Sequence, residues 1–448
     1  MPGPFRKLLV ANRGAIARRV IRACDKLGIR SVAVYSEADA GAPYLAEASE
    51  TLALSGSTAG ETYLNIPALV DCVKRSGADA VHPGYGFLAE STAFAVAIEH
   101  AGAVFVGPSS RFLEMMGDKI NARALMTELG LPVFAGSGAV SDLDAALQAA
   151  ERIGYPIMLK PAGGGGGIGM RAVRDADELS RTFSQARKLV AAAFDDDTLF
   201  LEACIASPRH VEIQVIGDGK GGAMHLYERD CSLQRRHQKV IEEAPAPGIS
   251  RKELDLLATK AAVVAGAMNY DSAGTLEMLR DADGKFGFLE MNTRIQVEHG
   301  VTEAVTGIDL VATQIELAAG GRLPEQPPLD GFAMEARVYS EDPRTGLPST
   351  GLLSHFRLPD MFGVRVDTGY AQGQAVTPFY DPLLAKVIGW GTTREQAVGR
   401  LLVALKGLEI RGVQTNIPLL EVVLQDDEFL AADLDTGFLD RRRWLPHR

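Results

Sequence analysis

The chain has 448 residues, of which 46% are hydrophobic and 23% charged, and its net charge is −11. The length predicts about two to four packed lobes, and the composition is typical of a globular protein rather than a disordered chain. The negative charge argues against a nucleic-acid partner, which needs a basic face. The sequence has no run of about 18 apolar residues, so no transmembrane helix is expected. The four cysteines are far apart, without zinc spacing, and no signal peptide is found, so a cytoplasmic location is expected.

The first 115 residues alternate between strand and helix patterns. An amphipathic helix is expected over about residues 15–27, between two apolar runs. The turn Asn12-Arg13-Gly14 has one glycine where a dinucleotide-binding turn has three, so a Rossmann-like fold is expected without a nicotinamide function. We predict a parallel sheet covered by helices. Its strands are expected at residues 7–11, 31–35, 79–82 and 103–106.

Residues 132–204 are expected to form a small separate lobe around the glycine run 163–167. No Gly-Lys-Ser/Thr sequence follows the run, so it is not a Walker loop. Strand patterns on both sides predict a flap whose backbone N–H groups could close over phosphates, with Lys160 adding positive charge. The alternative is a flexible linker. The strand expected over residues 199–205 could offer backbone groups to an adenine edge.

Two cationic features have plain interpretations when taken alone. Residues 228–239 are dense in charge, and a solvated loop is the usual explanation of such a run. Lys119, at the beginning of a predicted helix, would be a solvated surface group. Arg337 lies within an apolar strand, so it is expected either to have a structural partner or to face a ligand.

The segments 274–279 and 286–299 predict a β-hairpin around Asp283-Gly284. A two-residue turn there places Glu277 directly opposite Glu290, and two opposed carboxylates repel each other unless a cation such as a hard divalent metal lies between them. If the second strand stays extended, every second residue beyond Glu290 lies on one face. We interpret that face as the floor of a metal and phosphate site, the alternative being a solvated strand face. Its further members would be Asn292, Arg294, Gln296 and Glu298.

Prolines 324, 327 and 328 mark a boundary near residue 325. Residues 300–317, before it, are expected to form a loop and then a helix. The segment beyond it is strand-rich, with two helices near its end. The strands are expected at 333–339, 352–358, 364–368 and 384–390, and the helices at 395–408 and 418–424.

Taken together, these segments resemble the biotin carboxylase family of the ATP-grasp superfamily over nearly the whole chain. The most specific segments are residues 82–86 (HPGYG), the glycine flap, 228–239, 242–247 (EEAPAP) and 290–299. The resemblance implies an α/β fold, α+β overall, in three domains. These are a Rossmann-like N-terminal domain (1–115), an ATP-grasp domain (116–325) whose glycine-rich lid spans about 132–204, and a strand-rich C-terminal domain (326–448).

The resemblance also implies ATP-dependent carboxylation of biotin by bicarbonate, through carboxyphosphate. ATP would contact Lys119, Lys160, Gly166, Gly167, Met170, Glu202, Ile205, His210, Gln234, His237, Glu277 and Glu290. Two Mg²⁺ or Mn²⁺ ions would be held by Glu277, Glu290 and Asn292. Bicarbonate would be bound by Lys239, Arg294, Gln296 and Val297. The catalytic residues would be Glu298 as general base, Arg294, Lys239, and Arg337, which would bind biotin and stabilise its enolate.

No Met-Lys-Met biotinylation motif occurs, so the resemblance implies a stand-alone subunit that acts on a separate biotin carboxyl carrier protein. A carboxyltransferase subunit and a homodimer contact through Arg22, Phe362 and Arg365 are also implied. Departures from the family pattern include Ala15, Ala203, Pro161-Ala162 and Ile168, and none of them removes a catalytic group.

The final carboxyl acceptor remains open between acetyl-CoA, as in fatty acid biosynthesis, another acyl-CoA, urea and guanidine. Ile168 and the segments 299–301, 335–339 and 365–368 look closer to the urea and guanidine branch. Two other functions are alternatives. One is a different ATP-grasp ligase. The other is an ATP-binding regulatory subunit, which would need a broken catalytic set, whereas the set here is intact.

Overall fold

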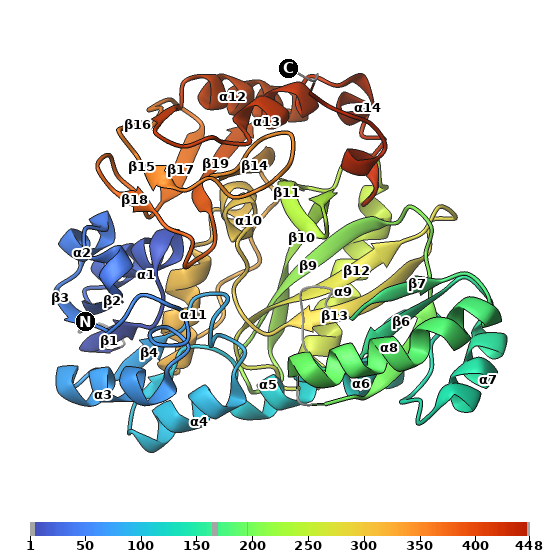
Figure 1. The fold of residues 1–448 in the computed structure, drawn as a ribbon. Coiled ribbons are helices and arrows are strands. Elements are labelled where there is room, and N and C mark those ends of the chain that lie inside the picture. The colour runs from blue at the N-terminus through green and yellow to red at the C-terminus, as the bar shows by residue number, and fades with distance from the viewer. Residues whose placement is uncertain (1–4, 164–168, 195, 446–448) are drawn as a thin grey trace.

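The structure is a computed structural model that describes residues 5–163, 169–194 and 196–445 (Figure 1). The molecule is mixed α/β, as the sequence predicts, with a five-stranded parallel sheet, a three-stranded sheet and an eight-stranded antiparallel sheet. No helix in these described residues combines the length and apolar character that a membrane span requires.

The N-terminal sheet has the strand order β3-β2-β1-β4-β5, and its pairs are parallel. Leu8 and Val10 pack with α1 on one face, whereas Leu9 packs with α3 and α4 on the other. Burial on both faces explains why these strands are continuous apolar runs. The strands are β1 (Lys7–Val10), β2 (Arg30–Tyr35), β3 (Glu50–Ala53), β4 (Ala80–His82) and β5 (Val104–Phe105). The helices are α1 (Gly14–Lys26), α2 (Pro43–Glu47), α3 (Ile66–Ser76), α4 (Thr92–His100) and α5 (Ser110–Gly117), with a 3₁₀ turn, η1, at Glu37–Asp39.

A small lobe follows α6 (Lys119–Glu128) and has a hydrophobic core of its own. Its antiparallel sheet has the order β7-β6-β8, and two helices pack on it, one through Ala150 and the other through Phe183. The tip between β6 and β7, which contains Gly164–Ile168, lies outside the described residues. The elements are α7 (Leu143–Ile153), β6 (Ile157–Pro161), β7 (Arg171–Val173), α8 (Ala176–Phe194) and β8 (Leu199–Ala203).

The large sheet has the order β13-β12-β9-β10-β11-β14-β19-β17. It runs across the proline-rich boundary near residue 325, because β11 pairs with β14. Its strands are β9 (Arg209–Gly217), β10 (Ala223–Arg235), β11 (Gln238–Ala244), β12 (Ala273–Arg280), β13 (Phe286–Asn292), β14 (Phe332–Tyr339), β17 (Val364–Thr368) and β19 (Leu383–Gly391). The helices around it are α9 (Arg251–Ala267), α10 (His299–Thr306), α11 (Leu310–Ala318), α12 (Arg394–Lys406), α13 (Ile417–Val423) and α14 (Asp427–Leu430), followed by a 3₁₀ turn, η2, at Phe438–Asp440.

Three expectations about these elements are wrong. Residues 228–239 are not a solvated loop but parts of the buried strands β10 and β11, in which Arg229 is fully buried. Residues 300–317 contain two helices, α10 and α11, separated by a turn at Gly307. The strand expected at 352–358 is broken, because β15 (Gly351–Leu352) and β16 (His355–Arg357) pair with different partners, β18 (Ala375–Val376) and β20 (Glu409–Arg411).

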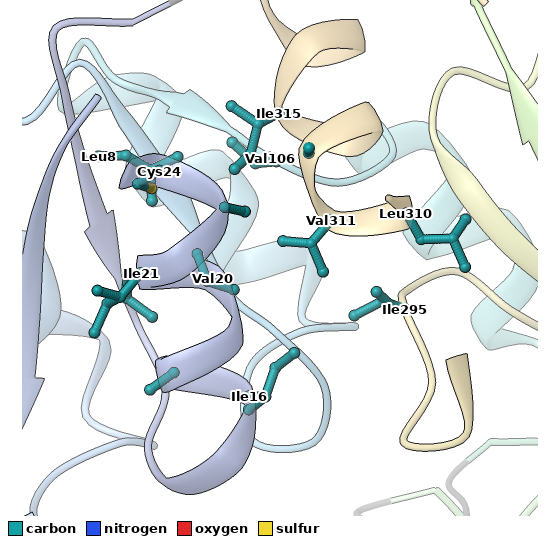
Figure 2. Close-up of a cluster of buried hydrophobic side chains, with 14 of the residues drawn as sticks. Leu8, Ile16, Val20, Ile21, Cys24, Val106, Ile295, Leu310, Val311 and Ile315 are labelled. Atoms are coloured by element: carbon teal, nitrogen blue, oxygen red, sulfur yellow. The ribbon is translucent and has the colours of Figure 1, made fainter. Parts of the chain in front are cut away.

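One apolar cluster connects the N-terminal helix α1 with the residues that follow β13 (Figure 2). Ile16 and Val20 lie on one face of α1, as their spacing predicts, and Figure 2 places them near Leu310 and Val311 of α11. Ile295 packs in the same cluster and is 1% exposed. Burial of one such side chain contributes about 1.5–3 kcal/mol, so the chain beyond β13 is fixed against the N-terminal sheet.

Candidate active site

The hairpin β12–β13 pairs Glu277 with Glu290, as predicted. The predicted two-residue turn is wrong: Gly284 N–H donates to the Asp281 carbonyl (3.1 Å), and Arg280 pairs with Phe286. The register shifts by one residue between Glu277 and Met278. This irregularity compensates for the longer turn, so the two carboxylates still face each other.

The strand ends at Asn292, so the expected extended face does not continue to Glu298. Residues 293–298 instead form an irregular segment, which we call the catalytic loop. Glu90 accepts hydrogen bonds from the Thr293 N–H (3.2 Å) and from Arg294 Nε (3.0 Å). Lys386 Nζ donates to the Val297 carbonyl at 2.5 Å. These contacts and the buried Ile295 fix the position of the loop, which takes the place of the expected continuation of the strand.

A cavity of about 500 Å³ lies between the small lobe and the large sheet. Every predicted site residue that the structure describes lines it. Gly166 and Gly167 lie outside the described residues. The lining includes Lys119, Lys160, Met170, Glu202, Ile205, His210, Gln234, His237, Lys239, Glu277, Glu290, Asn292, Arg294, Gln296, Val297, Glu298 and Arg337.

One end of the cavity, here the acceptor end, is a cluster of paired charges. Lys239 Nζ donates to Glu212, to Glu277 (3.1 Å) and to Glu298 (2.8 Å). Arg337 donates through Nη2 to the other oxygen of Glu298 at 3.0 Å. Burial alone would raise the pKa of Glu298, but Lys239 and Arg337 lower it to about 2. Glu298 is therefore an ionised carboxylate held between two cations.

The other end, here the nucleotide end, is bordered by the small lobe. Lys160 Nζ lies 2.5 Å from Glu202, which also pairs with Arg123 at 2.9 Å. Apolar side chains from both sides, Met158, Leu279 and Leu289, add a surface that suits a flat ring. A lysine beside an apolar wall is a suitable arrangement for the phosphates and base of a nucleotide.

A buried histidine connects the two ends. His210 Nε2 lies 3.0 Å from Glu277, and its Nδ1 lies 2.9 Å from the side-chain amide of Gln234. Burial lowers the pKa of His210, but Glu277 and Glu212 outweigh burial and raise it to about 9. The imidazolium adds positive charge beside the facing carboxylates.

The donor set between the two ends fits a hard divalent cation. Glu277 and Glu290 face each other across adjacent strands, and Asn292 lies next to them and donates to Glu277 at 2.7 Å. Carboxylate and amide oxygens are the ligands that Mg²⁺ and Mn²⁺ take. Lys119 Nζ, 3.3 Å from Glu290, also lies beside this set, where phosphate oxygens would need a cation.

Several residues that support the site were missed from the sequence. Arg229 is fully buried and donates to Gln296, to Glu212 (3.3 Å) and to Thr275 (3.2 Å). Glu212 had a signal, since residues 210–215 alternate with one polar face. Glu90 and Lys386 had none, because their partners in the catalytic loop lie far away in the sequence.

A small lobe above an antiparallel sheet, with lysines and facing carboxylates in the cavity between them, defines an ATP-grasp enzyme. Family models agree over three consecutive segments. They are "Biotin carboxylase, N-terminal domain" over residues 4–113, "Carbamoyl-phosphate synthase L chain, ATP binding domain" over 118–326, and "Biotin carboxylase C-terminal domain" over 335–441. The chain is 47% identical to a biotin carboxylase of Halalkalibacterium halodurans over 97% of each chain. It is 45% identical to biotin carboxylase 2 of Bacillus subtilis over 97% of this chain and 99% of that one. The chain belongs to the biotin carboxylase family.

Solved structures agree with this assignment. A biotin carboxylase complex with a β,γ-ATP ligand from Campylobacter jejuni has a TM-score of 0.96 and 40% identity, over 98% of this chain and 99% of that one. The biotin carboxylase domain dimer of Hydrogenobacter thermophilus 2-oxoglutarate carboxylase has a TM-score of 0.95 and 42% identity, over 99% of each chain. That structure contains MgADP, ADP and bicarbonate.

Proposed function

We propose that this chain uses ATP and bicarbonate to carboxylate biotin that is attached to a separate carrier protein. The observation that carries the proposal is the position of Glu298, an ionised carboxylate between Lys239 and Arg337, in the same cavity as the facing Glu277 and Glu290. The relative that binds MgADP and bicarbonate supports the same substrates here.

We assign the nucleotide and metal ligands as the sequence predicted them. Lys119 and Lys160 would bind phosphates, while Glu202 and Ile205 would face the base. Glu277, Glu290 and Asn292 would hold two Mg²⁺ or Mn²⁺ ions, which would supply positive charge against the negative charge that develops on the phosphates. The remaining ATP contacts would be Gly166, Gly167, Met170, His210, Gln234 and His237.

The bicarbonate step follows from the charges around Glu298. An oxygen of bicarbonate attacks the γ-phosphorus, the bond to ADP breaks, and the bicarbonate proton passes to Glu298. Lys239 and Arg294 offset the negative charge, with Gln296 and Val297 as further contacts. Because Lys239 and Arg337 hold the pKa of Glu298 low, an anion that takes over their N–H groups would make Glu298 a stronger base.

The carboxyphosphate formed in this way breaks into carbon dioxide and phosphate. The ureido nitrogen of biotin passes its proton to this phosphate and forms a bond to the carbon of the carbon dioxide. Arg337 is assigned to the biotin enolate oxygen, because a guanidinium donates to a planar group in a fixed fork. It is 8% exposed and lies at the acceptor end, beside Glu298.

The partners follow as part of the same proposal: a biotin carboxyl carrier protein, a carboxyltransferase subunit, and a second copy of the chain. Phe362, at the expected dimer contact, is 83% exposed, which suits an apolar partner. Arg22 pairs with Glu47, and Arg365 with Glu303 and Asp367, within the chain. The three proposed domains remain 1–115, 116–325 and 326–448.

The test is ADP release with Mg²⁺, measured with and without bicarbonate and free biotin. Bicarbonate-dependent hydrolysis that biotin stimulates is the expected result. In the Glu298→Gln variant the rate of bicarbonate-dependent hydrolysis should fall about 10²–10⁴-fold, the usual contribution of a general base. Asp283→Asn, at the exposed hairpin tip, is the control.

Three outcomes would contradict the proposal in different ways. No bicarbonate-dependent hydrolysis in the wild type would exclude the function. Unchanged hydrolysis in Glu298→Gln would exclude the role of the base. Stimulation by amino-acid acceptors in place of biotin would point to a different ATP-grasp ligase.

A further inference from the structure

Two buried glutamates face each other behind the acceptor end. Glu242 on β11 pairs in register with Glu335 on β14, and both side chains are fully buried. Directly opposed residues in an antiparallel pair have Cβ atoms about 4.5–5.5 Å apart. At that separation in a dry interior, two ionised carboxylates repel each other strongly.

Each of these carboxyls holds one cation and has one oxygen left over. Glu242 Oε1 accepts from Arg337 Nε at 2.5 Å, and Glu335 Oε2 accepts from Lys386 Nζ at 3.3 Å. Within residues 5–163, 169–194 and 196–445, neither Glu242 Oε2 nor Glu335 Oε1 has a hydrogen-bond partner. An unmet buried acceptor is destabilising, and more so when the group is charged. One proton on either carboxyl would remove the repulsion and supply a donor to the pair.

The charged or titratable groups that act on the pair come from several neighbouring elements. They are Lys239 on β11, Arg337 on β14, Lys386 on β19, Asp367 on β17, Glu298 in the catalytic loop and Tyr85 after β4. Burial raises the pKa of Glu242 to about 8, against the lowering effect of Arg337. Burial likewise raises the pKa of Glu335 to about 7, against Lys386 and Arg337. The raised pKa values of both carboxyls agree with one proton retained by the pair near neutral pH.

We propose that Glu242 and Glu335 share one proton and act together as positioning residues for Arg337 and Lys386. Glu242 fixes the guanidinium that faces biotin, and Glu335 fixes the lysine that holds the Val297 carbonyl of the catalytic loop. A second negative charge in the pair would draw both cations away from these tasks. The inference rests on the function proposed above.

The kinetic test uses Glu242→Gln, Glu335→Gln and the double variant. In each single variant the amide replaces the protonated carboxyl, keeps one negative charge and donates an N–H, so carboxybiotin formation near pH 7 should stay within about threefold of the wild type. In the double variant Arg337 keeps only its contact with Glu298, and carboxybiotin formation should fall about 10–100-fold, the cost of a small misplacement. ATP hydrolysis without biotin should fall much less, because Arg337 acts on biotin and Lys386 keeps Asp367 as a partner at 3.6 Å.

The matched control is Glu243→Gln. Glu243 is the next residue on β11, is buried, and pairs with Arg394 away from the cavity. Its replacement should not change the ratio of carboxybiotin formation to biotin-free hydrolysis. The inference is wrong if the double variant keeps the wild-type ratio, or if the single variants lose as much carboxybiotin formation as the double variant.

A second readout separates this inference from the function. The pKa values of the pair are raised on folding, so the pair stabilises the fold most at low pH, and this contribution is lost as pH rises through about 7–8. Between about pH 6 and pH 9 the melting temperature of the wild type should therefore fall more than that of Glu335→Gln. Equal falls would overturn the shared proton. A wild type that forms no carboxybiotin would instead exclude the proposed function, with this stability difference still expected.

Discussion

Two hairpins border the cavity, and they hold their charges in different ways. In β12–β13 the charged residues interrupt apolar strands, and Glu290 keeps about a third of its side chain exposed (34%). In β10–β11 the charges are dense and buried, as with Arg229, Asp230 and Glu228. On the first hairpin Glu290 is therefore a partly open ligand, whereas Glu277 and the cations of the second hairpin already have partners.

The charges on β10–β11 can be buried because the neighbouring strand β9 provides their partners. Arg229 and Lys239 both reach Glu212 on β9, and Arg209 on the same strand reaches Asp230. A buried charge is tolerated when an opposite charge and hydrogen bonds compensate it. A substrate at β10–β11 must therefore replace carboxylates at the cations, while a metal ion at β13 meets the partly exposed carboxylate of Glu290.

The largest effect is expected for Lys239→Met. It removes the cation shared by Glu212, Glu277 and Glu298, and breaking such a buried set costs about 3–5 kcal/mol of the free energy of unfolding. Bicarbonate-dependent hydrolysis should also fall about 10²–10³-fold, since a preorganised charge is lost. Urea unfolding and ADP release measure the two effects.

The double variant Lys239→Met/Glu212→Gln separates stability from chemistry. It removes one of the three carboxylates that lose Lys239, so part of the lost stability should return while activity stays low. If activity returned as well, Lys239 would be a counter-ion only, and the contrast between the two hairpins would not hold.

A middle effect is expected for Glu290→Gln on the open hairpin. The pair Lys119–Glu290 is partly exposed, so its loss should change the free energy of unfolding by only about 0–1 kcal/mol. The Mg²⁺ concentration that gives half-maximal hydrolysis should rise at least about tenfold, because a metal ligand is weakened. Asp283→Asn serves as the control, and an unchanged Mg²⁺ dependence would remove Glu290 from the metal site.

The sequence could predict the features that depend on neighbours along the chain. The parallel sheet followed from alternating elements, and the pairing of Glu277 with Glu290 followed from a turn signal close to both. Even there the predicted turn was wrong, and Glu277 faces Glu290 because a shift in the strand register compensates for the longer turn. The right residues reached the cavity although the strand ended at Asn292.

Features that depend on distant partners could not be predicted. The sequence does not show that Glu212 would neutralise Arg229 and Lys239, so the charged run was interpreted as solvated. The anchors of the catalytic loop are Glu90, in the turn before α4, and Lys386, on β19. Their long sequence separations leave no periodic signal, and only the folded chain brings them together.

The smallest effect concerns the turn between β10 and β11, where Arg236 (φ 52°) and His237 (φ 64°) are both left-handed. Such a conformation costs a non-glycine residue about 1–2 kcal/mol, which a glycine would not pay. Glycine, however, loses more chain entropy on folding, and this cancels about 0.5–1 kcal/mol of the relieved strain. Arg236→Gly should therefore raise the free energy of unfolding by up to about 1 kcal/mol and leave the KM for ATP nearly unchanged, because Arg236 does not line the cavity.

His237→Gly is the matched variant, since it relieves the same kind of strain one residue later. It should stabilise the hairpin similarly but raise the KM for ATP, because His237 lines the nucleotide cavity. Equal KM values in the two variants would show that His237 holds the turn without contacting ATP. A rise in both would show instead that the strained backbone, braced by Arg235 and Glu341, is what positions the nucleotide.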